Sequence, residues 1–193
     1  MGQVCGTIDR IDPHGQVNKA FTNDPDMVMS SAIDNERIYM HMYVDTASSL
    51  ICVHELSNHK QLMTWKHPVI PYFGQSMSVT HDAKLAVGDW PSKQVIIYSL
   101  TGDVIKKVPC PPLLTMDGCV CMRSCGDESV IISDRAAGKV VRMSLKDGSL
   151  LWSSDKVTTP SGIVHHPAGY VLVASSSTNK TEISVLDEEN GRS

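Results

Sequence analysis

The chain has 193 residues, a formal net charge of -4 and six cysteines. Its length fits one domain with a substantial core, and its scattered charges form no basic stripe, which argues against RNA as a partner. No stretch approaches the length of a membrane span, and the first residues lack the apolar run of a secretory signal. We therefore expect a cytoplasmic protein that binds no membrane, with free and mostly buried thiols.

Taken in chain order, the predicted elements are short apolar strands separated by turn signals, and no window shows sustained helical spacing. Residues Gly6–Phe21 hold two such strands, and several longer groups follow. Prolines fall in the linkers between groups, as expected for a residue that lacks a ladder donor. These boundaries define a single region, 1–193, with the parts 1–22, 27–66, 76–109, 118–154 and 161–193.

The clearest group runs from Ser129 to Trp152. An apolar run ends in Asp134, a turn follows, and a second alternating run, Lys139–Leu145, leads to Asp147-Gly148. Asp-Gly is a strong hairpin signal because glycine accepts the positive φ that such turns need. One more apolar strand precedes the group, so the repeat consists of four antiparallel strands joined by hairpins.

A repeat period of about 44 residues emerges from the turn signals. Corresponding pairs are His14-Gly15, Asn58-His59, Thr101-Gly102, Asp147-Gly148 and Asn190-Gly191. The middle strand of the repeat is predicted to end at Met42, Asp89, Asp134 and Ser175. Four-stranded propeller blades have about this length.

We therefore predict an all-β fold, a partial β-propeller of about four to four and a half four-stranded antiparallel blades. The prediction favours an open arc or a fragment of a six-bladed ring. The alternative is a small ring closed by pairing between the N-terminal strands and the C-terminal blade. An open arc leaves an apolar blade face bare at each end, which predicts self-association through open blade edges.

Three segments carry a resemblance to NHL-type repeats, and to the C-terminal propeller of invertebrate tripartite-motif proteins: Leu85–Asp89, Val130–Asp134 and Pro160–Pro167. Met42 and Ser175 depart from the pattern, which has Asp at the strand end. The resemblance implies a non-enzymatic scaffold that presents loops to a protein or peptide. It also implies the substrate-recognition end of a tripartite-motif-like protein.

Two other families offer alternatives. Gln61–Trp65 and Asp147–Trp152 are similar to pyrroloquinoline-quinone repeats, which implies that Trp65 and Trp152 pack between blades of a quinone-type propeller. A gluconolactonase- or regucalcin-like hydrolase of sugar lactones would instead need Asp89, Asp134 and Asn179 around a divalent cation. Strand-end Asp residues more often cap turns, so we predict no catalytic residue and favour a protein that is not an enzyme.

The candidate binding residues lie in the loops that propellers use to hold partners. They are Tyr43, Asp89, Trp90, Asp134, Arg135 and Asn179. Trp90 precedes Pro91 in a turn, and an exposed aromatic residue near arginine is typical of an interface hot spot. The alternative is that Trp90 folds back onto the neighbouring blade.

Cys119, Cys121 and Cys125, with Cys110 nearby, are the candidate ligands of a metal site. Structural zinc is usually bound by paired C-x2-C knuckles, whereas this spacing places Cys119 and Cys121 on one face of a strand, as core residues. His165 and His166 are adjacent on a strand and point to opposite faces, so we expect one buried and one solvent-facing ring. We therefore predict no metal and no cofactor.

Overall fold

The computed structural model describes residues 7–11, 17–22, 27–45, 48–68, 76–116, 120–126, 128–176 and 181–193. Within these ranges every regular element is a β-strand and every strand pairing is antiparallel, which confirms the predicted all-β fold. No helix able to cross a membrane occurs in the described part of the chain.

The chain divides into two compact units, residues 1–71 and 72–193. The first unit holds a two-stranded sheet, β1 (Thr7–Ile11) and β2 (Val17–Thr22). It also holds a four-stranded sheet of β3 (Met27–Ile33), β4 (Arg37–Asp45), β5 (Ser48–Glu55) and β6 (Gln61–His67). The predicted strand end at Met42 is wrong, because β4 continues to Asp45 and pairs with β5 over this stretch.

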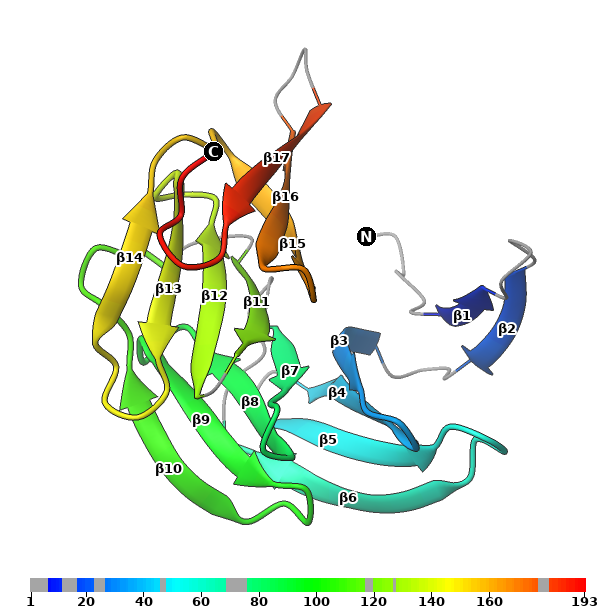
Figure 1. Ribbon diagram of the computed structural model, residues 1–193. Coiled ribbons are helices and arrows are strands. Elements are labelled where there is room, and N and C mark those ends of the chain that lie inside the picture. The colour runs from blue at the N-terminus through cyan, green and yellow to red at the C-terminus, as the bar shows by residue number, and fades with distance from the viewer. Residues whose placement is uncertain are drawn as a thin grey trace. The chain divides into compact units, whose positions relative to one another are not determined.

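The second unit holds three sheets whose strands follow one another in sequence order (Figure 1). The first contains β7 (Met77–Val79), β8 (Lys84–Asp89), β9 (Gln94–Ser99) and β10 (Val104–Pro109). The second contains β11 (Val120–Cys125), β12 (Ser129–Asp134), β13 (Lys139–Ser144) and β14 (Leu150–Ser154). The third contains β15 (Pro160–His166), β16 (Tyr170–Ser176) and β17 (Thr181–Asp187). These sequential meanders are propeller blades, as the repeat predicts.

Positive φ angles occur at the second residue of each described turn pair: His59, Gly102, Gly148 and Gly191. The amide of each donates to the carbonyl that ends the preceding strand: Glu55, Ser99, Ser144 and Asp187, respectively. The turns at His59, Gly148 and Gly191 therefore have the same hydrogen-bond pattern, whereas the turn at Gly102 is one residue shorter. The fifth pair, His14-Gly15, lies outside the described residues.

The first strands of neighbouring blades in the second unit lie side by side, since β11 contacts both β7 and β15. Small hydroxyl side chains bridge them. Ser76 Oγ accepts from the Met122 amide at 2.9 Å, and Ser78 Oγ accepts from the Ser124 amide at 2.9 Å. The two partners of each bond are 46 residues apart, so positions one residue away from equivalence in successive blades meet at the inner strands.

Two apolar clusters join the three blades. The first, between blades β7–β10 and β11–β14, includes Val95, Ile97, Met122, Val130 and Leu145. The second, between blades β11–β14 and β15–β17, includes Cys125, Ile131, Trp152, Ile163 and Val173. Trp152 is buried here, which confirms its predicted place between blades, whereas Trp65 on β6 is half-buried.

Blade β15–β17 has one buried face and one exposed face. Strand pairing aligns Val164 with Leu172 and Val185, and Ala174 with Ile183, on the exposed face. Val164, Ile183 and Val185 are 56%, 70% and 52% exposed, whereas Val95 and Ile97 at the matching places of β9 are buried in the first cluster. We call these five residues, Val164, Leu172, Ala174, Ile183 and Val185, the open face.

Candidate functional site

The two aspartates predicted in binding loops are buried turn caps. Asp134 accepts hydrogen bonds from the amides of Thr115, Met116 and Ala137 at 2.8 to 2.9 Å. Asp89 accepts from Gln94 Nε2 at 2.6 Å and more weakly from a turn amide. Backbone and side-chain donors therefore occupy both carboxylates, which is the capping role considered from the sequence.

Trp90 is only 3% exposed and belongs to the first apolar cluster, together with Met122 and Val130 of the next blade. Its ring lies against Gly88, where an added Cβ would be 2.2 Å from Trp90 Cζ2. The expectation of an exposed hot spot is therefore wrong for this side chain. Trp90 instead folds back onto the neighbouring blade, because Gly88 leaves room for the indole.

The other predicted binding residues that the structure describes belong to different units of the chain. Arg135 is exposed in the turn after β12, and Tyr43 is half-buried on β4 in the first unit. Asn179 lies outside the described residues. The binding role of this set stays a prediction, with Arg135 as its exposed member in the second unit.

The cysteines considered for a metal site separate into different surroundings. Cys110 packs against the first apolar cluster, whereas Cys121 and Cys125 belong to the second. Cys119 lies outside the described residues. The described thiols therefore do not converge as a set, but Cys125 meets two side chains from the next blade that the sequence did not connect with it.

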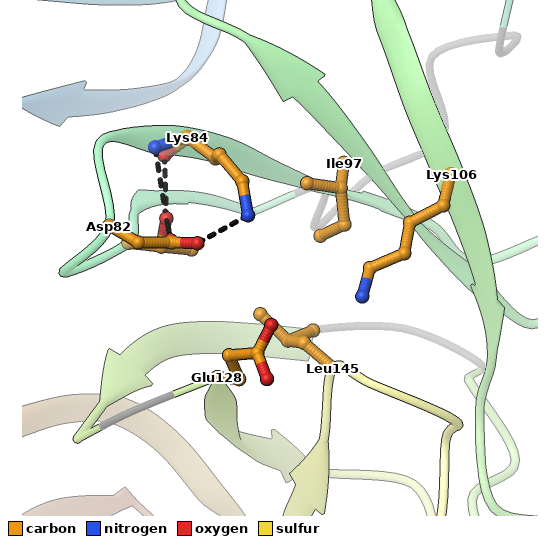
Figure 2. Close-up of a pocket in the computed structure, with 7 residues that line it drawn as sticks. Asp82, Lys84, Ile97, Lys106, Glu128 and Leu145 are labelled. Atoms are coloured by element: carbon orange, nitrogen blue, oxygen red, sulfur yellow. Dashed lines mark hydrogen bonds and ion pairs between the residues drawn. The ribbon is translucent and has the colours of Figure 1, made fainter.

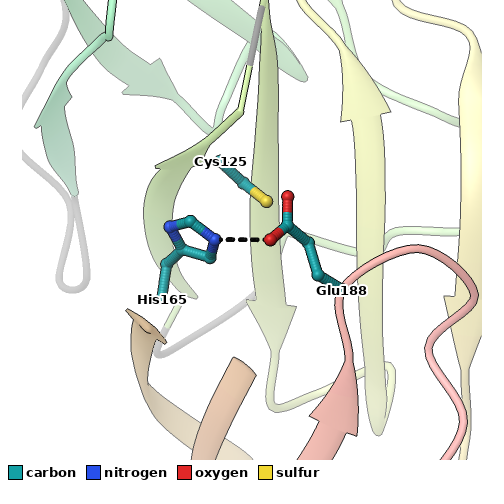
Figure 3. A group of neighbouring side chains, drawn as sticks. All are labelled: Cys125, His165 and Glu188. Atoms are coloured by element: carbon teal, nitrogen blue, oxygen red, sulfur yellow. Dashed lines mark hydrogen bonds and ion pairs between the residues drawn. The ribbon is translucent and has the colours of Figure 1, made fainter. Parts of the chain in front are cut away.

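Those two side chains are His165 and Glu188 (Figure 3). Cys125 ends β11, His165 lies near the end of β15, and Glu188 directly follows β17. His165 Nε2 is 2.8 Å from Glu188 Oε2, and one ligand atom from each of the three residues lies within 4.8 Å of the others. The thiol is buried, whereas the imidazole and carboxylate side chains are 25% and 18% exposed, so the cluster opens to solvent on one side.

Glu188 is held firmly in place. Its carbonyl accepts from Trp152 Nε1 at 2.7 Å and from Arg142 Nη1 at 2.9 Å, and its amide donates to the Gly169 carbonyl at 3.0 Å. Arg142 Nη2 also lies 3.5 Å from Glu188 Oε1. Both the backbone and the carboxylate are therefore oriented by groups of two blades.

Protonation decides what the cluster can do. The hydrogen bond with His165 lowers the pKa of Glu188, so this carboxylate is charged at neutral pH. Burial and a hydrogen bond to Glu188 raise the pKa of the Cys125 thiol to about 12. The raised pKa favours the neutral thiol at Cys125, whereas a nucleophilic cysteine reacts as the thiolate beside its base.

Two charged residues at this blade contact replace apolar residues found at the preceding one, whereas the positions of Cys125 and His165 hold the polar Thr80 and Ser124 there. In the pairing of the second and third strands of each blade, Lys84 faces Ser99, Ser129 faces Ser144 and Tyr170 faces Asp187. These three pairs occupy equivalent positions in the three blades. Arg142 then corresponds to Ile97, and Glu188 to Leu145, both buried in the first cluster. A sequence signal was therefore present: charged residues stand in aligned repeats at positions that are apolar elsewhere.

A shallow notch marks the equivalent place at the preceding contact (Figure 2). Ile97 and Leu145 form its floor, Lys106 and Glu128 border it, and an ion pair joins Asp82 with Lys84 at its rim. Its cavity volume of about 10 Å³ is far below the roughly 300 Å³ at which pockets for small molecules begin. The notch therefore does not fit a cofactor-sized ligand.

Comparison of the sequence with protein-family models and with curated proteins gives no match. Solved structures do match. A chain of a mitotic checkpoint complex is 12% identical, over 91% of this chain and 54% of that one, with a TM-score of 0.62. The WD40 repeats of RRP9 are 12% identical over 86% and 47%, with a TM-score of 0.62. Streptogramin B lyase is 12% identical over 95% and 76%, with a TM-score of 0.60.

Identities this low establish the fold and no more: the protein is built of β-propeller blades, like WD40 propellers and others. The chain spans about half the length of the first two structures. The NHL and tripartite-motif relationship expected from the sequence stays a prediction.

Proposed function

We propose that the protein is a non-enzymatic interaction scaffold that binds a polypeptide partner at the open face of blade β15–β17. The observation that carries this proposal is the exposure of Val164, Ile183 and Val185 beside one another on one sheet face. Equivalent faces in the two preceding blades are buried against a neighbour. Contiguous exposed apolar surface of this kind is typical of interaction sites.

The edge of the same blade adds directional contacts. Among the described residues no strand pairs with the outer side of β17, so backbone donors and acceptors face outward there. The turn that follows is already formed, with the Asp187 amide donating to the Arg192 carbonyl at 2.7 Å. An extended segment of a partner can therefore pair with β17 while its apolar side chains cover the open face.

A protein partner is supported by the matching chain that comes from a mitotic checkpoint complex. The net charge of -4 does not favour RNA. A finer proposal, based on the NHL resemblance, is that the chain forms the substrate-recognition end of a tripartite-motif-like protein in the cytoplasm.

The test compares capture of binding proteins by the immobilised wild-type chain and two double variants. Ile183→Lys with Val185→Lys charges the open face, whereas Val104→Lys with Ile105→Lys charges similarly exposed positions of β10. The proposal expects a captured protein to be lost with the first variant and retained with the second. Equal retention by both variants would refute it.

Two further readouts separate the alternatives. Light scattering after size-exclusion chromatography identifies a second copy as the partner if wild type is a dimer and the open-face variant a monomer. Hydrolysis of sugar lactones with Ca²⁺ or Zn²⁺ would instead favour the lactonase alternative, since that reaction needs a divalent cation.

A further inference from the structure

We propose that Cys125, His165 and Glu188 form a zinc site that ties blade β11–β14 to blade β15–β17. The inference is independent of the scaffold role. Figure 3 shows the sulfur, the ring nitrogen and the carboxylate directed toward one another from three separate elements. The sequence alone predicts no metal, because the cysteines, the His165-His166 pair and the strand-end aspartates each lack a complete ligand set within their own stretch of chain.

The distances suit a tetrahedral ion after small adjustments. Zinc bonds of about 2.0 to 2.3 Å place tetrahedral ligand atoms roughly 3.3 to 3.6 Å apart. The three candidate ligand atoms already lie within 4.8 Å of one another. The 2.8 Å contact between His165 and Glu188 has to widen by about 0.5 Å, and the sulfur has to lie within about 3.6 Å of the other two atoms. Side-chain rotations of this size need no rearrangement of the strands.

The donor set selects the kind of metal. A thiol, an imidazole and a carboxylate together suit zinc, whereas calcium and magnesium prefer oxygen ligands alone. When zinc binds, the thiol proton leaves to solvent and the thiolate becomes the ligand. The partial exposure of His165 and Glu188 provides an entry path and leaves a fourth position for water.

The ligands are oriented before a metal arrives. Trp152 and Arg142 fix the backbone of Glu188, and Arg142 lies near Oε1, while Oε2 faces His165. Groups behind the ligands commonly raise metal affinity by 10- to 100-fold, because they hold a ligand in its binding orientation. The carboxylate oxygen nearest the imidazole is therefore the one available to the ion.

The residues at the preceding contact between blades give a second line of support for the site, separate from its geometry. At the preceding contact the positions of Arg142 and Glu188 hold Ile97 and Leu145, which pack in an apolar cluster. Partly buried ionic groups rarely stabilise a fold more than apolar residues of similar size. The charged pair Arg142 and Glu188 in place of two packed apolar residues therefore favours a ligand that compensates for the loss of packing.

The neighbouring histidine and cysteine provide matched controls. His166 is exposed and stacks on Tyr170, with ring centroids 4.5 Å apart. Cys110 is half-buried in the other apolar cluster. Neither lies within the candidate site, so a change at either position leaves all three ligands in place.

The experiment titrates the metal-free, reduced full chain with Co²⁺, which reports tetrahedral geometry and thiolate ligation by its absorption. We expect one equivalent to bind, with a sulfur-to-cobalt charge-transfer band that Zn²⁺ displaces. Cys125→Ser should abolish that band, and His165→Asn should weaken binding at least 100-fold. Cys110→Ser and His166→Asn should bind as the wild type does.

Several results would overturn the site: no saturable binding, a spectrum without thiolate ligation, or a band that survives Cys125→Ser. If circular dichroism shows that the ligand variants do not fold, the thermal stability of the wild type with and without Zn²⁺ still tests the site. Zn²⁺ at 100 times its dissociation constant should raise the melting temperature of wild type and of both control variants by several degrees. No rise in melting temperature would count against the proposal.

Discussion

The contact between Gly88 and Trp90 permits a sharp test of the packing. Replacing Gly88 by alanine would bring a methyl group to 2.2 to 2.5 Å from three atoms of the Trp90 ring. The ring is buried on all sides and cannot move away freely. Overpacking of this kind costs about 1 to 3 kcal/mol, whereas Gly→Ala in a compatible backbone stabilises by about 0.4 to 1 kcal/mol.

Trp90→Ala alone should cost about 3 to 5 kcal/mol, because it removes a large buried side chain and leaves a cavity. In that background the new methyl group has room, so Gly88→Ala should become neutral or stabilising. The double-mutant cycle is therefore expected to show a coupling energy of at least about 1 kcal/mol. The same two changes made together should be less damaging than the sum of their separate effects.

The assay is urea unfolding followed by far-UV circular dichroism, which does not depend on the tryptophan that is removed. Gly162→Ala is the control, since its added Cβ would meet Ala174 at an ordinary 3.8 Å. It should change the unfolding free energy by less than about 0.5 kcal/mol. Equal losses for Gly88→Ala with and without the Trp90 ring would refute the packing described here.

Two further changes test buried polar groups. Burial lowers the pKa of His41 to about 3 and of His67 to about 4, so the unfolded chain takes up protons first as pH falls below about 6.5. The free energy of unfolding should then drop between pH 7 and 5 by about 2 kcal/mol per histidine. In parallel urea titrations the His41→Met variant should lose less unfolding free energy on acidification than the wild type. An equal loss in the variant and the wild type would contradict this explanation. Glu188→Leu should cost about 1 to 3 kcal/mol in thermal unfolding, because it removes the carboxylate that pairs with Arg142 Nη2 and His165 Nε2. Adding Arg142→Ile should restore part of the loss, and a larger loss in the double variant would speak against the pair.

Much of the fold could be predicted because its signals are local. A turn pair with glycine or asparagine sets a positive φ within two residues, and the repetition of such pairs gives the blade period. His59 also has a positive φ although it is not glycine, so the repeat period could be recognised even in the repeat whose turn lacks glycine. The end of β4 was misplaced, since nothing near Met42 stops a strand and its pairing with β5 carries it onward.

The side chains that form the candidate site were harder to predict because they come from different blades. Trp90 looked exposed in its turn, and only the space above Gly88 explains why it is buried. Cys125 and Glu188 belong to different sheets, and a contact between them depends on how those sheets pack. Aligning the repeats by register would have shown the charged residues at apolar positions, although not their geometry.

The polar cluster and the open face concern the same blade, and one physical reason connects them. Blades β7–β10 and β11–β14 continue from the turn after the third strand into a fourth strand that pairs along it. In blade β15–β17 no fourth strand is paired among the described residues, so other groups have to hold that turn. The bonds from Trp152 and Arg142 to the Glu188 carbonyl do this, and zinc bound at its carboxylate would strengthen the same point. A partner that adds a strand to β17 would then meet an edge whose turn is already fixed, and binding would require less ordering of the chain.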